Sequence, residues 1–200
     1  MGATTSSPTV GVLALQGAFA VHEQRLRECG VSARQVRTPE DLTHVDALVM
    51  PGGESTTMSK LLTTSGLFDL LASRLEDGMP VFGTCAGMIL LATEVLDGRP
   101  DQRSFSAIDI AVRRNGYGRQ VDSFEAELDI SSVGDPPFHG VFIRAPKVER
   151  VGPGVELLAE YQGVPVLLRR GRVSVASFHP ELAGDARLHD LFIATITESN

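Results

Sequence analysis

Short, almost unbroken apolar runs alternate with longer amphipathic segments along the first half of the chain. Residues 9–15, 47–50 and 80–83 are apolar at nearly every position, which is typical of strands buried on both faces of a parallel sheet. Between the first two runs, apolar residues recur at helical spacing over residues 18–29. The pattern predicts alternating strands and helices, with a further strand at residues 31–36.

The rest of the pattern completes the predicted fold. Further helices are expected from about residue 38, over residues 61–75 with a break at Ser65 and Gly66, over residues 88–96, and over residues 185–197. Strands separated by turns are expected at residues 108–112, 124–130, 141–143, 155–161, 164–168 and 173–177. We therefore predict an α/β fold whose open, mostly parallel, flavodoxin-like sheet has helices on both faces and an antiparallel extension in the second half. Ligands bind such sheets at the carboxyl ends of the strands.

Composition restricts the partners and the location of the chain. Of its 200 residues, 42% are hydrophobic and 22% are charged, so we expect a single domain over residues 9–200 after a disordered N-terminus at residues 1–8. The net charge of −7 and the scattered basic residues argue against nucleic acid. No apolar run approaches the roughly 20 residues that span a bilayer, and no signal peptide begins the chain. We expect no membrane association and a cytoplasmic location.

A candidate nucleophile follows the apolar run at residues 80–83. Cys85 lies between Gly83 and Gly87, which is the small-x-nucleophile-x-small pattern of a nucleophile elbow between a strand and a helix. The start of a helix favours the thiolate, because the helix dipole is positive there. A buried structural role is the commoner one for cysteine, and we assign that role to Cys29, which lacks such a context.

A cysteine nucleophile needs a general base, and the base needs an orienting group. His179 follows the strand expected at residues 173–177, and in extended backbone Glu181 lies on the same face. The other four histidines, at positions 22, 44, 139 and 189, are interpreted as packed or solvated. Cys85, His179 and Glu181 are thus the predicted triad. Metal binding by the same three residues is the competing interpretation, but zinc sites usually contain more His or Cys, and we predict no metal.

The sequence PGGEST at residues 51–56 ends another apolar run. Ser55 or Thr56 can serve as the N-cap of a helix there. The backbone amides of Gly53 and Ala86 can form an oxyanion hole for a tetrahedral intermediate. By itself the PGG sequence indicates only a turn, so this assignment depends on the combination with the predicted triad.

These motifs together resemble the class I glutamine amidotransferases, and most closely the glutaminase subunits of pyridoxal 5′-phosphate synthase. The resemblance covers nearly the whole chain, through LQGA at residues 15–18, PGGEST at 51–56, CAGMILLA at 85–92, the segment 114–125 and FIRAP at 142–146. It implies glutamine hydrolysis by the Cys85, His179 and Glu181 triad, without a cofactor. It also implies glutamine contacts at Gly53, Glu54, Ser55, Arg114, Ile143 and Arg144. Residues 97–104 look longer and more polar than the family pattern and are left unassigned.

The resemblance further implies a protein partner. Such glutaminases pass ammonia to a barrel-shaped synthase subunit that makes pyridoxal phosphate from ribose 5-phosphate and glyceraldehyde 3-phosphate, and we expect that subunit to dock near Gln16 and Gly17. Two alternatives stay open. One is a catalytically silent subunit that binds only glutamine or a partner, and the other is a stand-alone cysteine hydrolase on a related fold. A complete triad disfavours the first, and the segments 114–125 and 142–146 would be unexplained by the second.

Overall fold

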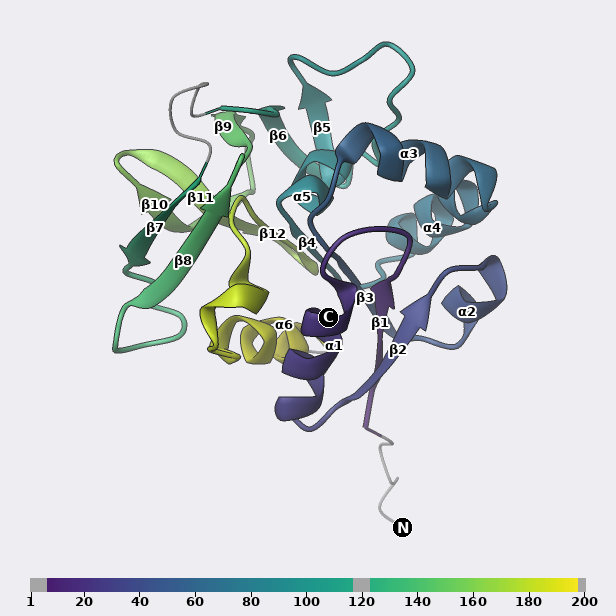
Figure 1. Ribbon diagram of the computed structural model, residues 1–200, viewed down its shortest axis with the longest axis horizontal. Helices are drawn as coiled ribbons and strands as arrows, with labels where there is room; N and C mark the ends of the chain where they lie inside the picture. Colours follow the sequence, from purple (N-terminus) through teal and green to yellow (C-terminus); the bar gives the residue numbers. More distant parts are fainter. Residues whose placement is uncertain (1–6, 117–122, 198–200) are drawn as a thin grey trace.

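Residues 7–116 and 123–197 are described by the structure, a computed structural model of the chain. Within these ranges a seven-stranded sheet forms the centre of the fold (Figure 1). Its strands are β1 (Thr9–Leu13), β2 (Ser32–Val36), β3 (Ala47–Met50), β4 (Val81–Thr84), β10 (Glu156–Tyr161), β11 (Val164–Arg170) and β12 (Val173–Ala176). In the order β2-β1-β3-β4-β12 the neighbours are parallel, and β11 and β10 extend the sheet by antiparallel pairing.

Two small sheets, formed mostly by strands of the second half of the chain, accompany the central sheet in the described residues. Strands β5 (Ala92–Val95), β6 (Ile108–Arg113) and β9 (Lys147–Val151) form one, and β7 (Ser123–Leu128) and β8 (Phe138–Ile143) form the other. The β7–β8 pair is antiparallel, as is the β6–β9 pair. The predicted α/β fold, with a mostly parallel sheet and antiparallel strands added in the second half, is confirmed.

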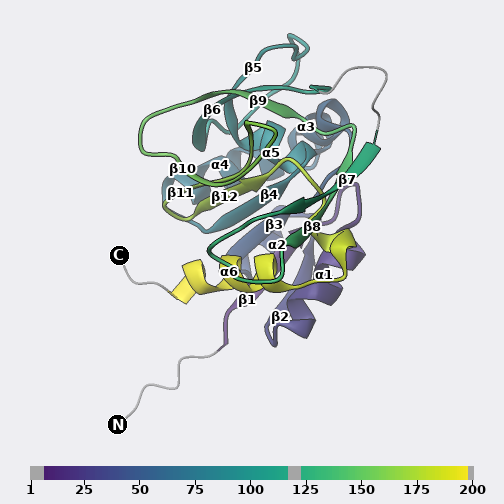
Figure 2. The ribbon, with the colours of Figure 1, turned by 90° about the vertical axis from the view of Figure 1, so that its left-hand side faces the viewer.

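Helices cover both faces of the central sheet (Figures 1 and 2). They are α1 (Phe19–Glu28), α2 (Pro39–Thr43), α3 (Ser55–Thr64), α4 (Leu67–Glu76), α5 (Ala86–Leu91), the short 3-10 helix η1 (Pro180–Ala183) and α6 (Arg187–Thr197). On one face, Val12 and Phe82 of the sheet join a buried cluster with Leu26 of α1 and Phe192 of α6. The opposite face packs against α3, α4 and α5 in a second cluster. Each short apolar strand is therefore buried on both sides, as its sequence predicts.

One local prediction was wrong, and two elements were missed. The helix expected over residues 88–96 ends at Leu91, because Thr93 and Val95 continue as β5 and pair with β6; β-branched residues favour this extended state. Strand β9 was missed because it alternates poorly, with most of its residues exposed. The helix η1 was also missed, since its four residues are too few to show a helical period.

Parts of two sequence segments discussed above lie outside the described residues. They are residues 1–6 of the N-terminus expected to be disordered and residues 117–122 of the segment 114–125. Among the helices that are described, none combines the length and the apolar character that a bilayer crossing requires.

Candidate active site

Four loops at the carboxyl ends of β1, β3, β4 and β12 surround a cavity of about 390 Å³. Ligands bind mostly parallel sheets at such loops, so the site was expected here. The cavity is lined by Gly17, Ala18, Gly52, Gly53, Glu54, Ser55, Cys85, Ile89, Arg114, Asn115, Ile143, Arg144 and His179. All six residues predicted to contact glutamine are in this set, together with two of the three triad residues. Ala18, Gly52, Ile89 and Asn115 were not predicted.

Cys85 occupies a strained turn between β4 and α5. Its φ of 50° and ψ of −105° lie outside the regions that L-residues usually adopt, and this is the geometry of a nucleophile elbow. The turn places Cys85, which is only 7% exposed, at the cavity and at the N-terminus of α5. There the Sγ–H group points to the Ile143 carbonyl oxygen at 3.9 Å.

His179 and Glu181 meet through a hydrogen bond of 2.8 Å between Nδ1 and Oε1. The reason given for their meeting was wrong, because Glu181 lies in η1 rather than in extended backbone. Pro180 begins this short helix, and its tight turn brings the carboxylate back to the ring of His179. His179 faces the cavity, whereas Glu181 is completely buried behind it. The arrangement matches that of a base and its orienting group.

Electrostatics favour charge on both members of this pair. Burial by itself would raise the pKa of Glu181, but its hydrogen bond to His179 and the His22 ring 3.2 Å from its second oxygen hold that pKa far below its usual range. Burial would likewise lower the pKa of His179, but its interactions with Cys85 and Glu181 raise it to about 10. A protonated His179 is the partner that a Cys85 thiolate requires, so the site is suited to nucleophilic chemistry.

His22 was interpreted as packed or solvated, and the structure gives it a more specific place. It is completely buried in α1, and its Nε2 atom lies 3.2 Å from Glu181 Oε2 and 3.3 Å from Thr84 Oγ1. Its Nδ1 atom lies 3.0 Å from Nε2 of His189, which is also completely buried. The sequence offered no signal for this pair, because the two histidines are separated by 166 intervening residues.

The PGGEST segment approaches the predicted triad closely. A side chain at Gly52 would collide with the His179 ring and crowd Cys85, so only glycine fits there. The predicted N-cap was wrong, because Glu54 rather than Ser55 or Thr56 caps α3 by accepting hydrogen bonds from the Thr56 and Thr57 amides. As for the proposed oxyanion donors, Gly53 lines the cavity and Ala86 begins α5.

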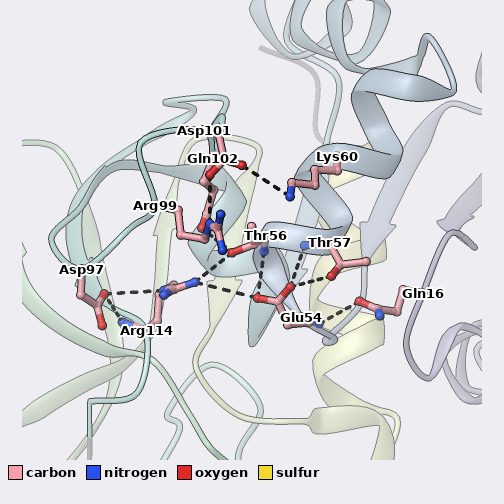
Figure 3. A network of polar contacts seen from close by, with 10 residues as sticks. All are labelled: Gln16, Glu54, Thr56, Thr57, Lys60, Asp97, Arg99, Asp101, Gln102 and Arg114. Carbon is pink, nitrogen blue, oxygen red and sulfur yellow. Dashed lines mark hydrogen bonds and ion pairs between the residues drawn. The ribbon is translucent and has the colours of Figure 1, made fainter.

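A polar network holds Arg114 in place at the cavity (Figure 3). Its Nη1 atom donates to Thr56 Oγ1 at 2.9 Å and lies 3.8 Å from Glu54 Oε1. Its backbone amide donates to Asp97 at 2.8 Å. Gln102 contacts the same Thr56 hydroxyl at 3.2 Å. The unassigned residues 97–104 thus contribute a brace for Arg114.

The predicted docking residues contact this same segment. Gln16 Oε1 accepts a hydrogen bond of 2.9 Å from the Glu54 amide. Gly17 has a φ of +89°, and a side chain there would overlap the Gly52 carbonyl oxygen. The loop after β1 therefore lies directly against the PGGEST segment.

Comparison with known proteins agrees with this geometry. The family model described as the SNO glutamine amidotransferase family matches residues 12–198. The chain belongs to this family. Among similar proteins, the pyridoxal 5′-phosphate synthase subunit PdxT of Mycobacteroides abscessus is 58% identical over 187 residues, covering 94% of this chain and 96% of that protein. PdxT of Nocardia farcinica is 55% identical over 196 residues, covering 96% and 87%.

Solved structures share the fold of this amidotransferase chain. The crystal structure of a glutamine amidotransferase superposes with a TM-score of 0.88 at 48% identity, covering 94% of this chain and 99% of the other. The structure of PurLQS from Thermotoga maritima gives a TM-score of 0.65 at 15% identity, covering 96% and 98%. The second likeness shows the fold alone.

The remaining candidates of the amidotransferase chain lie away from the cavity. Cys29 is a free thiol whose pKa is raised to about 12 by burial and by Asp190, which suits the structural role assigned to it. His139 is exposed on β8 between Glu125 and Glu127, and His44 is exposed at the end of α2. None of these groups lines the cavity.

Proposed function

We propose that this chain hydrolyses L-glutamine to L-glutamate and ammonia and supplies the ammonia to a pyridoxal 5′-phosphate synthase subunit. The observation that carries the proposal is the Cys85 thiol and the Glu181-bound His179 imidazole facing one cavity. Membership of the SNO glutamine amidotransferase family and the similarity to PdxT proteins support it. That both cysteines are free thiols agrees with the cytoplasmic location that we propose for the chain.

The reaction follows from the roles of the three residues. The Cys85 thiolate attacks the carboxamide carbon of glutamine, and the amides of Gly53 and Ala86 stabilise the oxyanion. His179 donates a proton to the departing nitrogen, so ammonia leaves and a glutamyl thioester remains. The same imidazole then removes a proton from water, which attacks the thioester and releases glutamate with the regenerated thiol. Glu181 keeps the Nδ1–H group of His179 oriented throughout.

The charged cavity wall suits the other end of glutamine. We propose that Arg114 and Arg144 pair with the α-carboxylate and that the carboxylate of Glu54 faces the α-amino group. The support is that all three residues line the cavity, with Arg114 held by Thr56 and Asp97. Ser55 and Ile143 also line the cavity and complete this wall.

Replacement of Arg114 by alanine is expected to raise the KM for glutamine about ten- to a hundredfold, because a hydrogen bond to a charged group is lost. The turnover number changes much less, since the reacting carboxamide lies at the Cys85 end. Steady-state kinetics of glutamate release measure both constants. Arg113→Ala is the matched control, because Arg113 is exposed and pairs with Glu149 instead. An unchanged KM in the Arg114→Ala variant would contradict the proposed pairing of Arg114 with the α-carboxylate of glutamine.

A synthase partner explains why the ammonia is not wasted. Ammonia released freely is mostly protonated at neutral pH and escapes to solvent, so hydrolysis without a partner is unproductive. We propose docking at Gln16 and Gly17, which contact Glu54 and Gly52. A partner that moves this loop also moves the Gly52–Gly53 peptide, whose N–H group is a proposed oxyanion donor. Glycine permits such a peptide reorientation at low cost.

Saturation with the synthase subunit is expected to raise the kcat of glutamine hydrolysis. Loss of one oxyanion donor costs about 100- to 1,000-fold in rate, so the increase should amount to an appreciable part of that range. The measurement is glutamate release by the isolated chain and by the chain titrated with synthase subunit. An isolated chain that already works at the full rate contradicts activation by docking.

The same assay separates the two alternative functions. A silent binding subunit binds glutamine without releasing glutamate under either condition. A stand-alone cysteine hydrolase releases no glutamate from glutamine. It hydrolyses substrates of another class in a reaction that depends on Cys85, and the synthase subunit does not change its rate.

A further inference from the structure

Two buried histidines stand behind the predicted triad, on the side of Glu181 that faces away from the cavity. His22 comes from α1 and His189 from α6, two helices that lie side by side on one face of the sheet (Figure 1). Neither residue lines the cavity, and both are completely inaccessible to solvent. The mechanism proposed above uses neither of them.

The Glu181 carboxylate needs a partner for each oxygen. Its Oε1 atom accepts the hydrogen bond from His179, which leaves Oε2 in a completely buried position. A buried carboxylate oxygen without a partner is costly and favours protonation. The Nε2 atom of His22, at 3.2 Å, is the group that faces Oε2 at ion-pair distance among the described residues. His22 thus offers the positive end of an N–H dipole to the second oxygen.

The positions of the protons follow from the same distances. A lone pair on His22 Nε2 would repel Glu181 Oε2, so Nε2 carries a proton, which this oxygen at 3.2 Å and Thr84 Oγ1 at 3.3 Å share. Burial lowers the pKa of His189 to about 3, so this ring is neutral, and its Nε2 atom shares one hydrogen with His22 Nδ1 across 3.0 Å. This contact holds the far side of the His22 ring and keeps its Nε2 atom toward Glu181.

The charged groups next to His22 and His189 have partners other than the Oε2 atom of Glu181. Arg25 of α1 donates from Nε to the backbone oxygen of Glu181 at 3.2 Å, not to its carboxylate. Asp185, which precedes α6, pairs with Arg187. His22 is left as the residue that fixes the carboxylate from behind.

We propose that His22 is a positioning residue of the glutaminase reaction, which holds the Glu181 carboxylate in the orientation that His179 requires, while His189 holds the far side of the His22 ring. The inference rests on the proposed function. It predicts that removing the N–H group at the Nε2 position lowers kcat while leaving the KM for glutamine unchanged, because His22 does not reach the cavity.

A matched pair of substitutions tests this role. The amide nitrogen of glutamine extends as far along the side chain as imidazole Nε2, whereas that of asparagine reaches only as far as Nδ1. His22→Gln therefore retains a donor for Glu181, and His22→Asn loses it, although both bury a similar amide. We expect kcat to fall about ten- to a hundredfold in the asparagine variant and no more than about threefold in the glutamine variant.

Two further measurements complete the test. Unfolding in urea gives the stability of each variant, and Leu26→Val serves as a control that loosens the buried core at α1 without changing a polar group. The rate of Cys85 alkylation by iodoacetamide, followed by mass spectrometry, reports the state of the triad even if glutamine is not the substrate. Slower alkylation and lower kcat in His22→Asn alone support the proposal. Equal kcat and equal alkylation in the two His22 variants, or rates that merely follow stability, overturn it.

A wild-type chain that releases no glutamate refutes the proposed function and leaves the alkylation comparison to decide the role of His22. A wild-type chain that hydrolyses glutamine, with both His22 variants equally active, refutes the positioning role alone. The two hypotheses can therefore fail separately.

Discussion

Replacing Cys85 by alanine is expected to abolish glutamine hydrolysis, with a loss of at least about 10⁴-fold in kcat. The reason is chemical, because the glutamyl thioester needs a sulfur atom and Cys85 carries the one thiol that lines the cavity in the described part of the chain. The methyl group of alanine fits the same turn, so folding should be preserved. Coupled measurement of glutamate, together with circular dichroism and urea unfolding, checks both parts.

Cys29 provides the internal control for this substitution. Its thiol has a pKa of about 12 and contacts the Ala186 carbonyl oxygen at 3.8 Å, so it is a poor nucleophile at neutral pH. A glutamine-like electrophile should therefore label Cys85 and spare Cys29, and Cys29→Ala should retain activity. Labelling at Cys29, with activity surviving in Cys85→Ala, would contradict the mechanism.

The fold was predictable where local patterns and tertiary packing agree. Strands β3 and β4 are four-residue runs buried on both faces, and an unbroken apolar run of that length, bounded by turn residues, is typical of a strand inside a parallel sheet. Prediction failed after Leu91, where an apolar run passes directly from helix to strand. Nothing local marks the change, because the pairing of β5 with β6 decides it. The strand β9 was missed for another reason, because most of its residues are exposed and its polar and apolar positions alternate poorly.

The sequence predicted those site residues that are identified by neighbours close to them in the chain. Cys85 lies in a turn motif, and His179 and Glu181 are two positions apart, so a short window contains each signal. The hydrogen bonds that hold Arg114 to Thr56 and Asp97 join three separate segments of the chain, so no short stretch of sequence predicts them. The contact between His22 and Glu181 spans most of the chain. Residue type suggested candidates, but only the fold shows which of them meet.

Replacing His179 by alanine is expected to cost more than replacing Glu181 by glutamine. The alanine variant lacks the group that moves the proton, which predicts a loss in kcat of up to about 10⁶-fold. Glu181→Gln keeps the shape of the side chain and removes its charge. Both variants should be compared with the wild type by kcat and by urea unfolding, so that a loss of folded protein is not read as a loss of chemistry.

The geometry around Glu181 explains why kcat should still fall about 10³-fold or more in the Glu181→Gln variant. An amide nitrogen facing His179 Nδ1 forces the ring proton onto Nε2, so the imidazole can no longer accept the proton of the thiol. In the reversed orientation the amide nitrogen faces the Nε2–H group of His22, and two donors oppose each other at the 3.2 Å contact. Each orientation therefore disrupts one side of the buried carboxylate position. A wild-type rate in either variant would reject the triad, and a larger loss in Glu181→Gln than in His179→Ala would show that His179 is not the base.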